Sequence, residues 1–310
     1  MSSTMLKGPY WVAARQHRRA LRAVPTVVAL ALIAVVALRC WAEGPNSDQA
    51  GEPWPNNGYE LLRLLMGHAG TGLFFLPLLV GAFVAGPMTA RELESGTWRL
   101  ALTQSTTPRA WLGSKVLVAA VVSVLGSVAL TGVYRLGWAR VAGTYHLHWA
   151  DRGAYEASGP VLAAYCLLGV ALGVLVGQLV RRTLVAVALT GMLTGLVLLV
   201  LGALRWSLLP VQSGTGPLEG NPLQLVPASA LIMDTGLLTS TGERLPEYAC
   251  FERTHGQGVC PPDLDVIGWY AEFHPVSHYW PTQLVESSLV LALAGVALFA
   301  AFRLVGARRA

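Results

Sequence analysis

The 310-residue chain carries too little charge for a water-soluble protein of its size. Charged side chains make up 13% of the sequence and hydrophobic side chains 54%, whereas soluble domains contain about 25% charged residues. So few charged groups cannot cover a surface that faces water, so a soluble enzyme is excluded and an integral membrane protein is indicated. The net charge of +5 is therefore evidence on membrane topology first, and a hint of nucleic-acid binding only after that.

Six apolar runs are long enough to cross a bilayer as helices. A hydrocarbon core about 30 Å thick needs about 20 helical residues, and each run approaches or exceeds this length with almost no charge. The alternating pattern of a transmembrane β-barrel is missing from the sequence. We therefore predict an all-α membrane protein with six spans at Val24–Ala42, Ala69–Ala90, Val116–Leu136, Pro160–Val180, Thr183–Leu204 and Gln283–Val305.

The basic residues predict the orientation of these spans. With six spans both termini lie on one side, and that side collects most of the Lys and Arg residues, with Glu92 and Glu94 as its only acids. Because basic residues accumulate on the cytoplasmic side, we expect this side and both termini to be cytoplasmic. Four tryptophans then fall at the outer interface, where indole rings are enriched: Trp41, Trp138, Trp206 and Trp280.

Four regions follow from this topology. Residues 1–23 form a cytoplasmic helix, 24–204 the first five spans with an inner loop at 91–115, 205–282 an extracellular loop, and 283–310 the sixth span with a basic tail. The basic stripe of the first region fits two roles, contact with anionic lipid or contact with a protein partner. It consists of Arg15, Arg18, Arg19 and Arg22.

The predicted extracellular loop is rich in proline, which excludes long helices. Its apolar patches predict short helices at the membrane surface, at Leu223–Val226, Leu231–Met233 and Val266–Tyr270. Thiols outside the plasma membrane can oxidise, so we expect a Cys250–Cys260 disulfide worth roughly 2–3 kcal/mol; two free thiols are the alternative. A metal site here is disfavoured, because the sequence places a single imidazole nearby.

The spans lack ionisable residues at their centres. Ion-coupled transporters and selective pores need such groups inside the bilayer, so both classes are disfavoured. Glu286 begins the last span, where the helix dipole favours an anion, a role as plausible as substrate contact. Small residues recur every four positions, as at Gly169, Gly173 and Gly177 and at Ala119, Ser123, Ser127 and Thr131, and predict tight helix packing. No catalytic, metalloprotease or nucleotide-binding motif is found, which disfavours a membrane-embedded enzyme.

The inner loop at 91–115 reads as a short helix between two long ones. Gly96 can end the second span, and Thr97 can cap a short helix from Trp98 to Gln104. Thr107 and Pro108 can begin the helix that enters the third span. Such a short helix would act as a lever on both spans; an amphipathic helix resting at the headgroups is the alternative.

This loop carries a resemblance to a known family. Arg91-Glu-Leu-Glu-Ser-Gly-Thr97 resembles the cytoplasmic loop of type-2 ABC (ATP-binding cassette) exporter permeases, in which a motif of this kind precedes a coupling helix. An actinobacterial branch of these permeases is more similar still. The likeness to it rests on Arg15-Gln16-His17, on Gly81–Lys115 and on His274–Glu286, and six spans complete the pattern.

The resemblance implies a permease subunit of an ATP-driven exporter. The chain would pair with a second copy of itself and with a separate ATPase subunit that holds the ATP and Mg, while the chain itself holds no cofactor or metal. It implies a multi-pass protein of the plasma membrane, in contact with lipid and not with nucleic acid. A hydrophobic or amphipathic drug, antibiotic or peptide would pass along helices lined by Phe74, Phe75 and Phe83. The alternative is a non-transporting immunity or signalling component on the same fold.

Two sets of residues are expected to carry this function. The candidate outer gate comprises Tyr279, Trp280, Gln283 and Glu286. Within the coupling loop, the carboxylates of Glu92 and Glu94 would meet cationic or N–H groups of the ATPase, or else balance Arg91 and Arg99. The predicted ATPase-coupling residues are Arg91, Glu92, Glu94, Gly96, Thr97, Trp98, Arg99, Thr103, Gln104 and Arg109.

Overall fold

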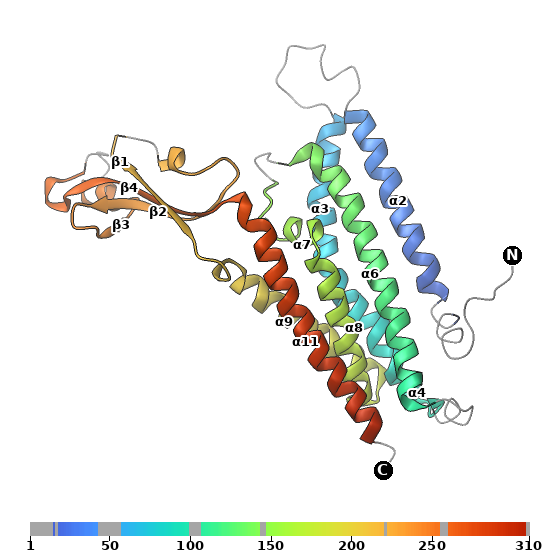
Figure 1. The fold of residues 1–310 in the computed structure, drawn as a ribbon. Helices are drawn as coiled ribbons and strands as arrows, with labels where there is room; N and C mark the ends of the chain where they lie inside the picture. Colours follow the sequence, from blue (N-terminus) through green and yellow to red (C-terminus); the bar gives the residue numbers. More distant parts are fainter. Residues whose placement is uncertain are drawn as a thin grey trace. The chain divides into compact units, whose positions relative to one another are not determined.

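A computed structural model of the chain describes residues 15, 18–42, 57–98, 107–142, 147–219, 222–254 and 260–307. The chain divides into two compact units (Figure 1). The helical unit comprises Met1–Arg205 and Gln283–Ala310, and the second unit comprises Trp206–Thr282.

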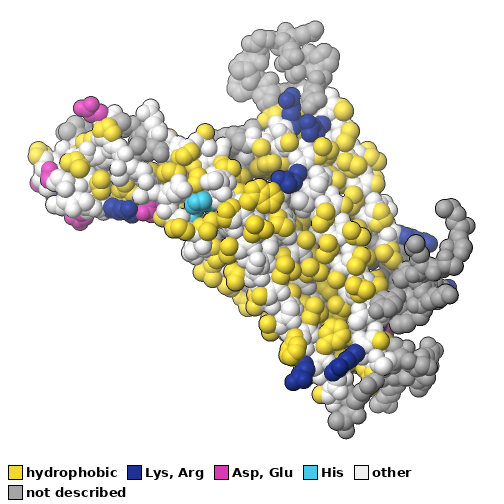
Figure 2. Space-filling view, in the orientation of Figure 1, with side chains coloured by type: hydrophobic (Ala, Val, Ile, Leu, Met, Phe, Trp, Pro, Cys, Tyr) yellow, Lys and Arg dark blue, Asp and Glu magenta, His cyan; other side chains and the backbone are white. Residues whose placement is uncertain are grey.

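Six helical segments of the described residues are long and apolar enough to cross a membrane, as the sequence predicts. The second span is longer than expected, because α3, η2 and α4 run continuously from Asn57 to Glu94. Figure 2 shows hydrophobic side chains covering much of the visible face of the helical unit. The elements are α2 (Arg18–Ala42), α3 (Asn57–Leu79), the π-helix η2 (Val80–Ala85), α4 (Gly86–Glu94), α6 (Pro108–Val141), α7 (Ala154–Ser158), α8 (Val161–Val180), α9 (Thr183–Leu204) and α11 (Tyr279–Ala307).

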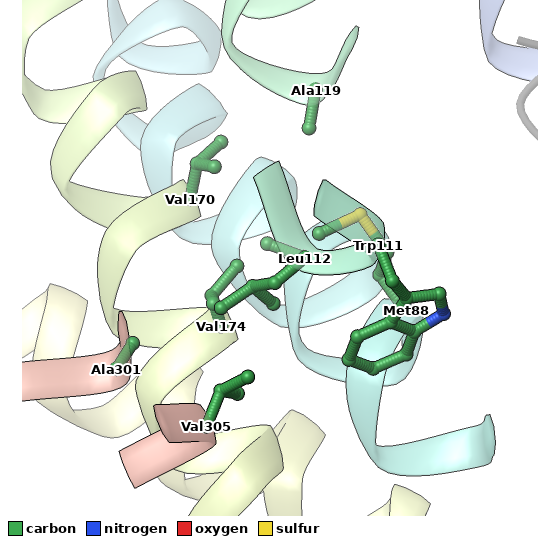
Figure 3. Packing of buried hydrophobic residues seen from close by; sticks show 9 residues of the cluster. Met88, Trp111, Leu112, Ala119, Val170, Val174, Ala301 and Val305 are labelled. Carbon is green, nitrogen blue, oxygen red and sulfur yellow. The ribbon is translucent and has the colours of Figure 1, made fainter. Parts of the chain in front are cut away.

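Helix α8 lies at the centre of the helical unit. Its glycines allow the second span to approach closely: a Cβ added to Gly169 would lie 2.6 Å from the carbonyl oxygen of Pro77, and one added to Gly177 would lie 2.3 Å from Oγ1 of Thr89. The predicted packing role of this glycine stripe is therefore confirmed. Nearer the end of the unit that contains Glu94, α4, α6, α8 and α11 share an apolar cluster that includes Met88, Trp111 and Val305 (Figure 3).

The connection between α4 and α6 is described only at its two ends. Helix α4 ends at Glu94, and Gly96 adopts a positive φ of 73° that glycine tolerates best. Thr107 accepts a hydrogen bond from the N–H of Ala110 and so caps α6, with Pro108 in the first turn. Both boundaries confirm the sequence prediction. Residues 99–106, with most of the predicted short helix, lie outside the described residues, as do most of residues 1–17 and the tail 308–310.

The second unit contains a four-stranded antiparallel sheet, so the all-α prediction is wrong for this part of the chain. Strands β1 (Gln212–Pro217), β2 (Leu231–Thr239), β3 (Arg244–Pro246) and β4 (Val266–His274) are ordered β1-β4-β2-β3. Two of the three predicted surface helices are instead the starts of β2 and β4, while Pro222–Leu225 is a 3₁₀-helix.

The side chains of β4 explain this outcome. The strand is rich in β-branched and aromatic residues, which fit a half-buried pleated surface, and it pairs with β1 on one side and β2 on the other. Gly236 of β2 sits opposite Tyr270, where an added Cβ would lie 2.7 Å from the tyrosine ring. Beyond β3, the short helix α10 (Ala249–Arg253) carries Cys250, which forms a disulfide with Cys260.

Candidate functional site

Two polar clusters lie at opposite ends of the helical unit. One end, here called the basic end, contains the C-terminal ends of α4 and α8 and the N-terminal ends of α6 and α9. The other end, here called the arginine end, contains the C-terminal ends of α6 and α9 and the N-terminal end of α8. Because each long helix joins the two ends, a displacement at one end can be transmitted to the other.

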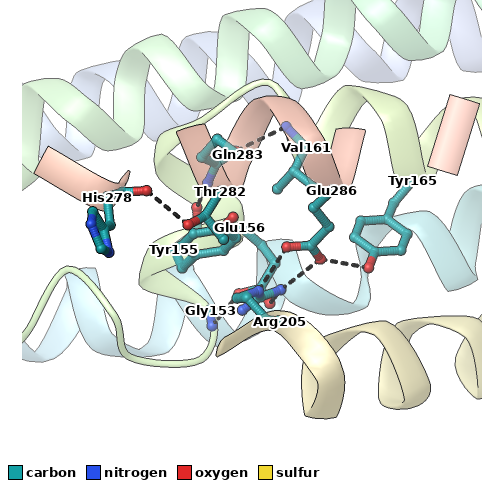
Figure 4. Close-up of polar contacts among 10 residues, drawn as sticks. All are labelled: Gly153, Tyr155, Glu156, Val161, Tyr165, Arg205, His278, Thr282, Gln283 and Glu286. Carbon is teal, nitrogen blue, oxygen red and sulfur yellow. Dashed lines mark hydrogen bonds and ion pairs between the residues drawn. The ribbon is translucent and has the colours of Figure 1, made fainter. Parts of the chain in front are cut away.

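The cluster at the arginine end is centred on Arg205, which follows the last residue of α9. The guanidinium is 3% exposed and bridges two carboxylates (Figure 4). Its Nη2 lies 2.6 Å from Oε1 of Glu156 in α7, and its Nε lies 2.8 Å from Oε2 of Glu286 in α11. A second bond of 3.0 Å joins Nη2 to Oε1 of Glu286, so this pair is bidentate. Arg205 therefore ties together three segments that are distant in the sequence.

The two carboxylates that Arg205 binds accept further hydrogen bonds. The Tyr165 hydroxyl on α8 donates to Glu286 Oε1 at 2.7 Å, and the backbone N–H of Gly153 donates to Glu156 Oε2 at 2.6 Å. Gly153 has a φ of 93°, and an added Cβ would lie 2.8 Å from the backbone of Gly70. Only glycine fits this turn without strain.

Gln283 of α11 closes the same cluster on its other side. Its Nε2 donates to the carbonyl of Tyr155 at 2.7 Å, and its Oε1 accepts from the N–H of Val161 at 3.2 Å. A Cβ on Gly159 would lie 2.3 Å from this amide, so that position must stay small. Gln283 thereby joins α11 to α7 and to the first turn of α8.

Sequence reasoning found only part of this cluster. Of the four predicted gate residues, Gln283 and Glu286 belong to it. Tyr279 and Trp280 pack edge to face against each other, with ring centroids 5.4 Å apart, and fall within the second unit. The prediction that Glu286 occupies the first turn of the last span is wrong: α11 begins at Tyr279, so Glu286 lies beyond the reach of the helix dipole and is held by its ion pair with Arg205. Arg205, Glu156 and Tyr165 were not predicted. The sequence did offer a signal, because one cation and two acids border the apolar spans, and ionisable residues beside such spans are rare and commonly functional.

The cluster at the basic end joins α4 to α6. Lys115 Nζ lies 2.5 Å from Glu92 Oε1, and the indole N–H of Trp111 donates to Glu92 Oε2 at 3.0 Å. Lys115 Nζ also lies 3.5 Å from the carbonyl of Met88. The lysine side chain is 5% exposed and that of Glu92 19% exposed, so this pair is nearly removed from solvent.

Glu94 attaches α4 to a third helix. Its Oε2 accepts hydrogen bonds from both the backbone N–H and the hydroxyl of Thr183, at 2.9 and 2.6 Å. Arg182 provides no side-chain cap for helix α9. The carboxylate of Glu94, which belongs to another helix, instead accepts a hydrogen bond from the first N–H group of α9, and its negative charge interacts favourably with the helix dipole. Unlike Glu92, Glu94 is exposed.

The structure places the remaining coupling residues as follows. Arg91, Thr97 and Arg109 are exposed, and Trp98 packs partly buried against the cluster of Met88 and Trp111. Glu92 and Glu94 have partners in the chain that the sequence did not predict. Arg99, Thr103 and Gln104 lie outside the described residues.

The contacts in both clusters are ion pairs and hydrogen bonds that join helices. Across the described residues, no group of three or more His, Cys, Asp and Glu side chains is arranged to hold a metal ion. His274 and His278 in the second unit face each other through Nδ1 at 3.0 Å, and His274 Nε2 lies 3.0 Å from the carbonyl of Trp206.

Comparison with known proteins adds one finding. A family model described as ABC-2 membrane transporter related matches residues 39–205, more than half of the chain. The match runs from the end of α2 to Arg205 and so includes both acids of the basic end, as well as Glu156. A search of curated proteins found no match.

Proposed function

Since the chain belongs to the ABC-2 membrane transporter related family, we propose that it is the permease subunit of an ATP-driven exporter. A separate ATPase subunit, which binds ATP and Mg, docks on the basic end from the cytoplasm. Two copies of the chain form the translocation path in the plasma membrane. The cargo is a hydrophobic or amphipathic compound such as a drug, an antibiotic or a peptide.

The attachment of the end of α4, where the α4–α6 connection begins, to two further spans is the observation that carries this proposal. Glu92 binds Lys115 and Trp111 on α6, while Glu94 binds Thr183 on α9. A force applied to the connection therefore displaces α4, α6 and α9 together. Separating the nearly buried Glu92–Lys115 pair costs several kcal/mol, so α4 and α6 move together before this contact breaks.

The arginine end supplies the opposing element, an outer gate. Arg205, Glu156 and Glu286 hold α7, α9 and α11 together by buried ionic contacts. We infer that this cluster keeps the gate closed at rest, and that movement of α9 from the basic end releases it. The gate is thus formed by Gln283 and Glu286 with Arg205, Glu156 and Tyr165.

The aromatic residues predicted to line the path lie partly on the outer surface of the helical unit. Phe83 is 65% exposed and Phe75 is 49% exposed on the surface of the second span. In a membrane these rings face lipid or a second copy of the chain, so they line the path only where it lies between the two copies. The cargo's hydrophobic character is accordingly argued from the family and the apolar spans.

Purification and flux measurements test the proposal. The chain is produced together with an ABC ATPase from the same source, purified through a tag on the chain, and placed in vesicles with a fluorescent hydrophobic dye. We expect the ATPase to co-purify and ATP to drive dye movement. Variant Glu94→Gln should weaken ATPase association or stimulated hydrolysis, and Glu219→Gln, an exposed carboxylate of the second unit, is the matched control.

Two outcomes would contradict the proposal in different ways. Co-purification of an ATPase whose hydrolysis moves none of a panel of hydrophobic dyes would support the non-transporting component. No association with any ABC ATPase would remove the permease assignment altogether.

A further inference from the structure

The cluster around Arg205 carries more negative than positive charge. Glu156 and Glu286 both pair with this guanidinium, and no other cation among the described residues forms an ion pair with either acid. Each of the four carboxylate oxygens accepts at least one hydrogen bond, from Arg205, from the N–H of Gly153 or from the hydroxyl of Tyr165. Such hydrogen bonds favour the ionised form of a carboxylic acid. The cluster therefore holds two negative charges and one positive charge.

The excess negative charge is buried. The side chain of Arg205 is 3% exposed, and those of Glu156 and Glu286 are 2% and 0% exposed. Water cannot screen groups that are enclosed in this way, and a buried charge without a compensating partner is costly. The two acids therefore need a cation in contact with them at all times, and with Arg205 in place they are still only partly neutralised.

The space that the guanidinium occupies, here called the cation site, also has an aromatic side. Cζ of Arg205 lies 3.8 Å from the centroid of the Tyr155 ring, well within the range of a cation–π contact. Carboxylates combined with an aromatic face are the groups that bind organic ammonium and guanidinium ions. The chemistry of the cation site thus fits an organic cation, and in this structure the chain supplies that cation itself.

The acids and the arginine belong to different parts of the bundle. Arg205 follows the end of α9, whereas Glu156 and the Tyr155 ring lie on α7 and Glu286 lies on α11. Gln283 joins α11 to α7 by its bonds to the carbonyl of Tyr155 and the N–H of Val161. A displacement of α9 therefore removes the guanidinium and leaves both acids and the ring together. The vacated site holds two buried carboxylates, and another cation that enters it removes the cost of leaving them unpaired.

We propose that the cargo is an organic cation with an apolar body, and that its ammonium or guanidinium group replaces Arg205 when the gate opens. This inference rests on the proposed function, in which movement of α9 releases the cluster. A tethered group competes with a free one at an effective concentration of about millimolar or more. The return of α9 therefore brings Arg205 back into the cation site and displaces the cargo. The two acids select the cargo by its charge, and the arginine drives its release.

Transport of two dyes that differ by one charge tests the selection. The chain and its ATPase are placed in phosphatidylcholine vesicles, whose surface carries no net charge and does not sort the dyes. Dansylcadaverine carries a primary ammonium group, and its N-acetyl derivative is neutral with the same fluorophore. We expect ATP-driven accumulation of the cationic dye to exceed that of the neutral dye by about thirtyfold, the lower limit for loss of one partner from a buried charge pair.

Loss of one carboxylate should reduce this preference. Glu156→Gln leaves one carboxylate for one guanidinium, so the ratio of cationic to neutral dye transport should fall towards one. The ratio is used because a general loss of transport affects both dyes alike. Glu60→Gln is the matched control, since Glu60 is a partly exposed acid that pairs with Arg63 outside the cluster. Its ratio should equal that of the unmodified chain.

Dye binding to the purified chain gives a second readout that needs neither ATP nor the ATPase. Arg205→Lys keeps a positive charge but cannot form the bidentate contact with Glu286, so a competing cation should enter the site more readily. We expect dansylcadaverine fluorescence to report tighter binding to Arg205→Lys than to the unmodified chain, and no such gain when Glu156→Gln is added. If the arginine were only structural, its replacement would not tighten binding. Circular dichroism verifies that each variant is folded.

The outcomes separate this inference from the proposed function. Equal ATP-driven transport of the two dyes would overturn the inference and leave the exporter in place. A preference for the cationic dye that survives in Glu156→Gln, or equal dye binding to Arg205→Lys and the unmodified chain, would also overturn it. If neither dye is transported but Arg205→Lys binds the cationic dye more tightly, the exporter fails and the cation site is supported.

Discussion

The two ends of the helical unit use the same kinds of groups at different degrees of burial. At the arginine end, Arg205, Glu156 and Glu286 are at most 3% exposed and satisfy one another. At the basic end, the Glu92 side chain is 19% exposed and Glu94 is exposed. Desolvated ions, which include the Glu92–Lys115 pair, are costly to separate, while an exposed carboxylate such as that of Glu94 exchanges partners easily. The arginine end is therefore suited to lock helices together, and the basic end to receive a docking protein.

Charge balance sharpens this comparison. The arginine cluster contains two carboxylates and one guanidinium, so its acids compete for a single cation and draw further hydrogen bonds from Tyr165 and Gly153. At the basic end, a single carboxylate, that of Glu92, binds Lys115, and Trp111 donates a second hydrogen bond to it. At the arginine end, loss of one carboxylate should therefore destabilise the protein less than loss of the arginine.

Cysteine labelling tests which end faces the cytoplasm, and its expected effect is all or none. In a Cys40→Ser background, Ala110→Cys at the start of α6 should resist a membrane-impermeant maleimide in intact cells, while Ser240→Cys in the second unit should react. Both positions are exposed, so access is decided by the membrane. Labelling of the Ala110→Cys variant from outside would reverse the proposed orientation and move the ATPase to the other end.

Replacement of the buried arginine should cause the largest loss of stability. Arg205→Met leaves two buried carboxylates without their cation, which costs about 3–5 kcal/mol. Glu156→Gln leaves a neutral Arg205–Glu286 pair and should cost clearly less. Thermal unfolding in detergent micelles measures both. Arg63→Gln at the same end is the control, because the Arg63–Glu60 pair is partly exposed and contributes about 0–1 kcal/mol. Equal losses of stability for Arg205→Met and Arg63→Gln would contradict the role of Arg205 in holding the helices together.

Loss of the Glu92 charge should have an intermediate effect. Glu92→Gln can keep a contact with Trp111 but weakens the bond to Lys115, and hydrogen bonds to charged groups contribute about 1.5–3 kcal/mol. We expect a lower unfolding temperature and weaker coupling of ATP hydrolysis to transport. A double-mutant cycle with Lys115→Met measures the pair itself; a coupling energy near zero would mean that α4 and α6 are not joined here.

Removal of the Glu94 cap should have the smallest effect on stability. Glu94→Gln retains an acceptor for Thr183 but loses its charge at the N-terminus of α9, worth about 0.3–1 kcal/mol. Thermal unfolding should therefore change little, while association with the ATPase falls. Thr183→Val, which removes the hydroxyl partner alone, separates the two roles. A large drop in unfolding temperature for Glu94→Gln with unchanged ATPase binding would assign Glu94 to folding only.

The second unit shows where reading the sequence failed. Short apolar patches between prolines fit a surface helix and a strand equally well, because too few residues are present to establish a period. Val266–His274 becomes a strand only because β1 and β2 pair with it from both sides. Those pairings join residues at least 27 positions apart in the sequence, and no local sequence pattern indicates them.

Features that depend on local chemistry follow from the order of residues along the chain. Long apolar runs must cross a bilayer, Gly96 and Thr107 set helix boundaries through their own backbone preferences, and the glycines of α8 permit close packing. Tertiary structure alone decided which polar groups meet. Glu286 finds Arg205 across 81 residues and Glu92 finds Lys115 across 23, since side chains pair according to helix position and rotation in the bundle.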